Sequence, residues 1–200
     1  MRGYLRLLVV LCASLLLSGC LAPKMYIDPT LPAASKADLS TSAAPQPIQL
    51  LYEFQTRGSP NARATAATKE KVFATATDSG LFSTVAAEPQ ANQRRLTIVI
   101  NNVPITQDAG AKGVGVGLTF GLVGTVVTDG YECTATLAVP GAEPLKFEYK
   151  HAIHTSIGNT APPMGLTPEP SAKEAGLKMV EQLTWSILRD VSRSGRLAAN

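Results

Sequence analysis

The sequence contains few of the residues and motifs that mark catalytic, nucleotide-binding or metal sites. Among 200 residues there are two histidines, three cysteines and one tryptophan. No set of glycines has the offsets of the G-x-G-x-x-G dinucleotide fingerprint, and the chain has neither a G-x-x-x-x-G-K-S/T phosphate loop nor a G-x-S-x-G nucleophile elbow. These absences predict a protein that is not an enzyme and that binds no cofactor.

Clustered positive charge and metal-ligand patterns are also missing. The charged runs 69–71 and 94–95 are too short to form the polybasic block of a nucleic-acid-binding protein, so we expect no nucleic acid partner. His151 and His154 lie three residues apart in a segment that reads as a strand. Residues with this spacing point to opposite faces of a strand, so the two rings are not expected to share a metal ion.

The amino terminus has the pattern of a secretory leader. Arg2 and Arg6 precede an apolar run from Leu7 to Leu17 that is too short to span a bilayer by itself. The run ends in Leu17-Ser18-Gly19-Cys20, which resembles the lipobox of bacterial lipoproteins: a branched apolar residue, two small residues and a cysteine. This resemblance covers the first 20 residues and implies that residues 1–19 are a signal peptide.

The lipoprotein resemblance assigns roles to Cys20 and to the residue after it. It implies that the Cys20 thiol takes a diacylglycerol as a thioether and that the chain carries fatty acyl groups such as palmitate. In these lipoproteins an aspartate directly after the cysteine retains the protein in the inner membrane. Here that position is Leu21, which implies the outer membrane, with the protein facing the periplasm. With Cys12 in the leader and Cys20 acylated, Cys133 alone forms neither an intramolecular disulfide nor a zinc site.

Proline, alanine and serine dominate the stretch after the lipobox. Between positions 20 and 47 prolines stand at 23, 29, 32, 45 and 47, a composition typical of flexible or polyproline-like linkers. We therefore predict that residues 20–47 are a lipidated tether that lets the folded part stand clear of the membrane. Residues 48–196 are predicted to form a single domain, because their number suffices for one core.

Four segments of this domain alternate apolar and polar residues with a period of two. They cover residues 48–56, 95–102, 131–139 and 145–153. This is the pattern of strands that bury one face, and the five-residue turn between the last two suits a hairpin.

Two helices complete the predicted elements. The first is expected to have Ser59 as its cap and Pro60 at its first position, and to end at Gly80. The second begins at Ser171, in an S-x-x-E capping box, and ends at Gly195. Core-facing positions are Val72, Phe73 and Ala76 of the first helix and, in the second, Leu177, Val180, Leu183, Thr184, Ile187, Leu188 and Val191. The order of elements predicts an α+β two-layer sandwich of about four mostly antiparallel strands, with two helices on one face.

An uncharged, glycine-rich stretch, GVGVGLTFGLVGTVVT, occupies residues 113–128 within an apolar insert over residues 109–129. Residues 113–128 are too few for a membrane-spanning helix, since they would span about 24 Å against a hydrocarbon core of ~30 Å. A membrane-crossing strand needs only about 9 to 11 residues, so length permits that interpretation. The third interpretation is a glycine-rich extension of the core sheet or an ordered apolar loop.

Contact with a membrane or a partner would use the larger apolar residues of the insert and one tryptophan outside it. The interaction candidates are Val114, Val116, Leu118, Phe120, Leu122 and Trp185. Trp185 lies at the edge of the apolar stripe of the second helix, beside charged residues. A half-exposed tryptophan there is typical of a contact site, but it can equally cover the rim of the sheet.

Together these features indicate a lipid-anchored periplasmic envelope lipoprotein that acts as a binding or assembly module. Its partners would be the membrane, through the anchor, and an envelope protein or a second copy of the chain. The alternatives are a carrier of a lipid or glycolipid in an apolar groove and, more remotely, a hydrolase. A carrier would copurify with lipid, an assembly module would copurify with a protein, and a hydrolase would place a histidine near a serine or an acid.

Overall fold

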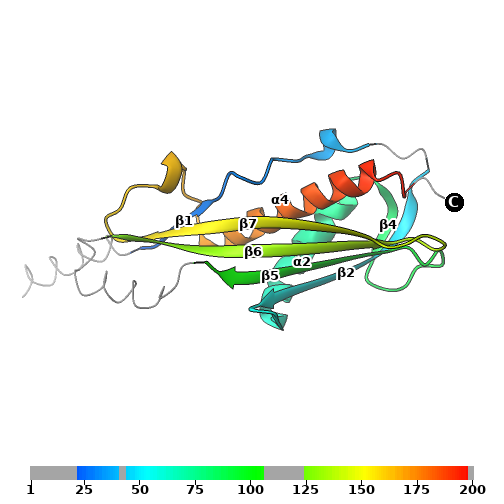
Figure 1. Cartoon of the computed structure of the whole chain (residues 1–200), viewed down its shortest axis with the longest axis horizontal. Helices are drawn as coiled ribbons and strands as arrows, with labels where there is room; N and C mark the ends of the chain where they lie inside the picture. The colour runs from blue at the N-terminus through cyan, green and yellow to red at the C-terminus, as the bar shows by residue number, and fades with distance from the viewer. Residues whose placement is uncertain (1–21, 41–43, 106–123, 198–200) are drawn as a thin grey trace, which may run out of the picture.

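The computed structural model describes residues 22–40, 44–105 and 124–197, which form one mixed sheet and two helices (Figure 1). In chain order the elements are β1 (Lys24–Ile27), η2 (Lys36–Asp38), β2 (Gln46–Thr56), β3 (Ser59–Pro60), α2 (Ala62–Asp78), β4 (Phe82–Ala86), β5 (Arg95–Pro104), β6 (Thr125–Ala138), β7 (Leu145–Ile157), η3 (Pro163–Gly165) and α4 (Ala172–Arg193). The α+β class is confirmed, and the sheet has seven strands where the sequence predicted about four.

The strand order is β1-β7-β6-β5-β2-β3, with β4 also paired to β2. Strands β1, β7, β6 and β5 are antiparallel neighbours, whereas β2 and β5 run parallel. Strands β2 and β5 are parallel because α2 lies between them in the chain. This helix returns the chain to the end of the sheet where β2 starts, as a crossover helix does. The sheet is therefore mixed, and because four of its six strand pairings are antiparallel, the prediction of mostly antiparallel pairing holds.

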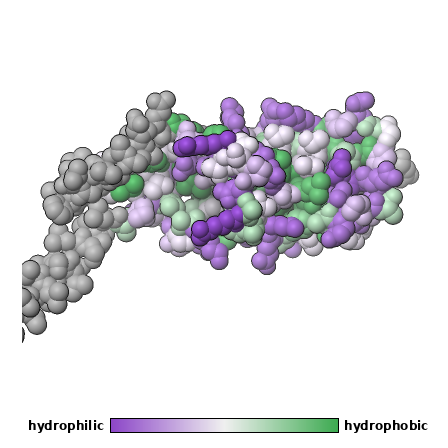
Figure 2. All heavy atoms as spheres, turned by 90° about the horizontal axis from the view of Figure 1, so that it is seen from below, coloured by the Kyte–Doolittle hydropathy of each residue, from purple (hydrophilic) through white to green (hydrophobic). Residues whose placement is uncertain are grey.

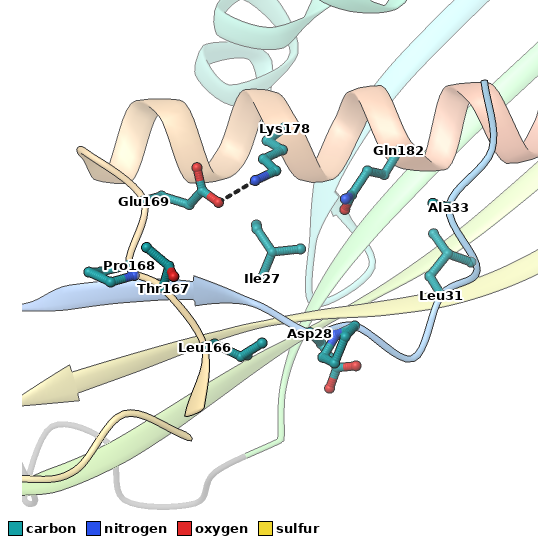
Figure 3. A pocket seen from close by; sticks show the side chains of 11 residues that line it. Ile27, Asp28, Leu31, Ala33, Leu166, Thr167, Pro168, Glu169, Lys178 and Gln182 are labelled. Atoms are coloured by element: carbon teal, nitrogen blue, oxygen red, sulfur yellow. Dashed lines mark hydrogen bonds and ion pairs between the residues drawn. The ribbon is translucent and has the colours of Figure 1, made fainter. Parts of the chain in front are cut away.

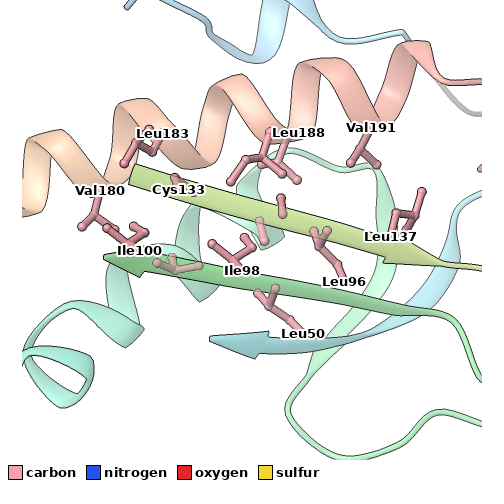
Figure 4. Close-up of a cluster of buried hydrophobic side chains, with 14 of the residues drawn as sticks. Leu50, Leu96, Ile98, Ile100, Cys133, Leu137, Val180, Leu183, Leu188 and Val191 are labelled. Carbon is pink, nitrogen blue, oxygen red and sulfur yellow. The ribbon is translucent and has the colours of Figure 1, made fainter. Parts of the chain in front are cut away.

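The four strands predicted from alternation are present as β2, β5, β6 and β7. Their register places like residues side by side: Leu50 pairs with Leu96, and Leu96 pairs with Leu137. All three are almost fully buried under the helices, and Figure 4 shows the strand side chains and those of α4 pointing toward one another. One cluster of buried side chains joins this sheet face to both helices, so the described elements share one core.

Helix α2 begins later than the sequence predicted. Its cap is Asn61, whose side-chain oxygen accepts a hydrogen bond from the Ala64 amide at 2.9 Å, so the prediction of Ser59 as the cap is wrong. The reason is a tight turn with positive φ at Arg57 and Gly58, which folds Ser59–Pro60 back as β3 against the end of β2. Of the residues expected to face the core, Val72 and Ala76 are buried and Phe73 packs at its edge.

Helix α4 follows the prediction closely. The Ser171 hydroxyl accepts a hydrogen bond from the Glu174 amide at 3.1 Å, and Gly195 lies just beyond the end with a positive φ, as a helix stop requires. The predicted stripe is buried except at Leu177, which is half-exposed, and Met179 joins it. This stripe supplies most of the helical side of the core.

Polar contacts fix α4 across β7. The Tyr149 hydroxyl donates to Asp190 Oδ2 at 2.8 Å, and Arg189 Nε donates to Asp190 Oδ1 at 2.8 Å. Burial, together with the adjacent Asp190 carboxylate, raises the pKa of Tyr149 well above its usual value. The hydroxyl therefore stays protonated and remains a donor.

The prediction of a free tether over residues 20–47 is wrong for much of its length. Residues Lys24–Ile27 form β1, which pairs with β7 at the edge of the sheet, and Tyr26 is 2% exposed. The chain then runs along α4, where the Ser40 amide donates to Ser192 Oγ at 3.0 Å (Figure 1). The sequence did not predict this strand, because four residues are too few to show alternation among so many prolines.

The carboxyl-terminal boundary predicted for the insert, residue 129, also changes. Strand β6 begins at Thr125, so residues 125–129 are paired with β7. The stretch TVVT at 125–128 is rich in β-branched residues and continues the strand that the sequence placed at 131–139. Residues 106–123 lie outside the described part of the chain.

Neither α2 nor α4, the long helices of the described residues, is both long and apolar enough to cross a membrane.

Candidate functional site

Of the site residues that the sequence predicted, only one lies among the described residues. Cys20 and the five insert residues Val114, Val116, Leu118, Phe120 and Leu122 lie outside the described residues. Trp185 lies on α4, where it is partly buried and packs against the core. Its use as a contact for a partner stays a prediction.

The flanks of the anchor and of the insert meet at one end of the sheet. Lys24, at the start of β1, pairs with Ser156 near the end of β7, and Thr125, at the start of β6, pairs with Ile157. The chain leaves the described structure after Ile105, which follows β5 at the same end (Figure 1). We call this end of the strands, where β1 starts and β7 finishes, the β1 end of the sheet.

Close packing fixes the backbone at the β1 end. A side chain at Gly124 would put its Cβ 2.5 Å from the backbone of Asn159, so only glycine fits where the chain re-enters the described structure. The Ile105 amide donates to the Thr128 carbonyl at 3.2 Å, and the Ile105 side chain lies over Gly130. The residues flanking the insert are thus held against the sheet.

A polar trio lies at the β1 end on the face away from the helices. His154 Nε2 lies 3.0 Å from Asp28 Oδ2, and His154 Nδ1 lies 2.9 Å from Thr128 Oγ1. Burial raises the pKa of Asp28, but hydrogen bonds from Thr30 and from His154 outweigh it and hold that pKa below its usual value. The trio joins β6, β7 and the residue that follows β1.

The trio has the order carboxylate, imidazole, hydroxyl, and it meets the criterion set above for a hydrolase, since His154 lies near an acid. A nucleophilic hydroxyl also needs backbone or side-chain donors aimed at the oxyanion that its attack creates. Thr128 lies within β6, and its carbonyl and cross-strand position are used in pairing with Ile105 and with β7. The contacts themselves hold three segments of the chain together.

The other histidine faces the helices. His151 Nε2 lies 2.7 Å from Gln182 Oε1 of α4, and burial lowers the pKa of His151, which favours the neutral ring. The two histidines therefore have different partners on opposite faces of β7, which confirms that their rings diverge. Among the described residues no group of three or more acidic, histidine or cysteine side chains is placed to hold a metal ion.

A cavity of about 510 Å³ opens between the end of β1, the loop before α4 and α4 itself (Figure 3). Its lining residues are Ile27, Asp28, Pro29, Leu31, Ala33, Leu166, Thr167, Pro168, Glu169, Lys178 and Gln182. Lys178 and Gln182 project from α4, and Lys178 Nζ pairs with Glu169 Oε1 at 2.6 Å. The volume falls within the range of roughly 300 to 1,000 Å³ seen for small-molecule sites.

Sequence reasoning missed this cavity and the polar trio. Asp28 lies in the stretch predicted to be a linker, and it is 126 positions from His154 in the chain. Lys178 and Gln182 read as the solvent-facing side of an amphipathic helix. No local pattern marks such residues, since only the folded chain brings them together.

No family model and no curated protein matches the chain. Among solved structures it is similar to protein XCC0632 from Xanthomonas campestris, with 14% identity over 78% of this chain and 92% of that chain and a TM-score of 0.39. It is also similar to a PelC dodecamer from Paraburkholderia phytofirmans, with 14% identity over 84% and 98% of the two chains and a TM-score of 0.34. A third is the rare lipoprotein B from Shewanella oneidensis, with 10% identity over 74% and 89% and a TM-score of 0.28. At TM-scores this low, these likenesses carry no argument about the activity or partners of this chain.

Proposed function

We propose that this chain is a lipid-anchored envelope lipoprotein of the outer membrane, acting on the periplasmic side as a binding or assembly module and not as an enzyme. One observation supports this most directly. The lipobox cysteine, Cys20, lies four residues before Lys24, and Lys24 begins a strand of the sheet. The anchor is thus joined to the folded core by a very short piece of chain.

That short connection determines how the module would work. Four residues reach at most about 14 Å, even when fully extended. A domain held this closely presents its β1 end to the membrane. The glycine-rich insert leaves and re-enters the described structure at the same end, so its apolar residues would meet the membrane, an envelope protein or a second copy of the chain there.

A second candidate function, a carrier of a lipid or glycolipid, is favoured by the cavity beside β1. Its lining mixes apolar side chains, such as Ile27 and Leu166, with the polar groups of Lys178 and Gln182. Such a mixture suits a molecule with an apolar part and a polar head. Mass spectrometry of organic extracts from the purified protein decides between the two: a carrier yields stoichiometric lipid beyond the anchor, whereas an assembly module does not.

The anchor is tested by replacing Cys20 with alanine. We expect this variant to lose incorporation of a clickable palmitate and to leave the membrane fraction as an unprocessed or soluble form, because the acyl chains supply about 0.8 kcal/mol per buried CH₂. Cys133→Ser is the matched control, since Cys133 is buried in the domain, and it should keep both properties. Leu21→Asp should move the protein to the inner-membrane fraction.

The result that overturns the proposal is equally direct. If Cys20→Ala keeps the same membrane partition and the same palmitate label as the unchanged protein, the lipobox is not used. If only Leu21→Asp fails to shift the protein, the anchor stands and the assignment to the outer membrane falls.

A further inference from the structure

Two large apolar side chains stand exposed among the described residues. Ile105 is 61% exposed and Met164 is 62% exposed, whereas the other large apolar side chains are buried or half-buried. A single exposed apolar residue is ordinary for a soluble surface. These two, however, lie on segments at the same end of the sheet.

Both residues belong to the β1 end of the sheet. Ile105 directly follows β5, and its amide is bonded to Thr128 near the start of β6. Met164 lies in η3, within the loop that leaves the end of β7 and returns to β1 at Glu169, whose amide donates to the Met25 carbonyl at 2.8 Å. Figure 1 shows η3 and the end of β5 on the side where β1 starts, and in Figure 2 apolar surface reaches that end of the molecule.

The backbone holds both side chains outward. Ile105 lies over Gly130, where a Cβ would come within 2.8 Å of the Ile105 side chain, so the isoleucine rests on bare backbone and cannot sink further into the sheet. Met164 has φ of 50°, a conformation that non-glycine residues seldom adopt, and it is followed by Gly165 with φ of 67°. Residues in such rarely populated conformations cluster at functional sites.

We propose that the β1 end of the sheet rests on the lipid surface, with Ile105 and Met164 placed in the interfacial region of the bilayer. This inference rests on the proposed function, because the acylated Cys20 supplies the membrane. The chain between Cys20 and Lys24 spans at most about 14 Å, so this end lies closest to the headgroups. Lys24 is exposed there, and its ammonium complements anionic headgroups.

The same placement determines the orientation of the whole domain. Strand β7 has 13 residues, so at ~3.3 Å per residue the sheet is about 43 Å long. The turn at 139–144, which joins β6 to β7, is at the opposite end. The strands therefore stand steeply on the membrane, and this turn faces the periplasm.

The experiment uses the full processed protein, with its acyl anchor, in vesicles of phosphatidylethanolamine and phosphatidylglycerol. Three variants, Ile105→Cys, Met164→Cys and Glu143→Cys, are labelled with an NBD fluorophore. Glu143 is exposed in the turn at the far end and is the matched control. Cys133 does not take the label, because it is buried and burial raises its thiol pKa to about 12.

We expect blue-shifted NBD emission at positions 105 and 164, and reduction by added dithionite several-fold slower than at position 143. Equal reduction rates at all three positions, in vesicles that carry the protein, would overturn the inference while the anchor stands. Protection of position 143 alone would reverse the orientation and overturn it too. Unlabelled protein that fails to float with the vesicles would refute the anchor itself. A thermal melt of each labelled variant verifies that it is folded.

Discussion

Replacing Ile27 with alanine tests whether β1 belongs to the folded core. Ile27 is the last residue of β1, is 9% exposed, and packs in the core cluster beside Ile153 of β7. If residues 20–47 were a free tether, as composition alone predicts, shortening the Ile27 side chain to alanine would leave the free energy of unfolding unchanged. In the structure the substitution removes three buried carbon atoms from the contact between β1, β7 and α4.

The expected cost is about 2 kcal/mol of unfolding free energy. Each buried CH₂ group contributes about 0.8 kcal/mol, so three give roughly 2.4 kcal/mol before the remaining exposure of Ile27 is allowed for. The larger costs of core truncations come from closed voids. Here the side chain already borders the open cavity beside α4, so truncation widens an existing space and adds no closed one.

Urea denaturation and thermal melts of the full chain measure this cost. For a chain of 200 residues, 1 kcal/mol shifts the midpoint temperature by about 2–4 °C, so Ile27→Ala should lower it by about 4 to 8 °C. The control is Ile105→Ala, whose side chain is 61% exposed and whose change should stay within about 0.5 kcal/mol. Equal stability of the two variants would refute this reasoning, because it would mean that β1 does not contribute to the folded core.

Two further predictions concern the polar contacts. Tyr149→Phe removes the donor to Asp190 and should lower the free energy of unfolding, measured by urea denaturation, by about 1 to 2 kcal/mol, whereas an unchanged midpoint would contradict a stabilising hydrogen bond between these side chains. The pKa values of the Asp28 and Asp190 carboxyls lie below their usual value, so their stabilising contribution is present above about pH 4 and is lost as the pH falls through the lower folded values. Asp28→Asn should make stability fall less steeply below about pH 4, and an identical acid profile would argue against this role.

The elements that the sequence predicted best are those whose own residues determine them. The burial of strand β7 alternates over its first six residues, and the stripe of α4 repeats over many residues, so one irregular position such as Leu177 does not hide the period. The Ser171 cap is also local, since its partner amide is only three residues away. Such features depend on neighbours in the chain and are visible in it.

The sequence did not predict one local turn and two contacts between residues far apart in the chain. Ser59 has the chemistry of a cap and precedes a proline, but the turn at Arg57 and Gly58 pairs it with β2, and pairing decides the outcome. Residues Lys24–Ile27 become a strand only because the edge of β7 is available to them. The contact between Asp28 and His154 depends on that pairing in turn, so no inspection of either neighbourhood could have found it.

The attachment of β1 has a mechanical consequence. Its four residues pair with β7 on one side, and Met25 accepts a backbone hydrogen bond from Glu169 on the other. A pull on the residues before Lys24, directed away from the end of the sheet, acts along the strand and loads its hydrogen bonds in shear. Bonds in shear share the tension and break together, whereas bonds that are peeled open fail one after another. Tension that reached the domain through its amino terminus would therefore meet the sheet in its stronger direction.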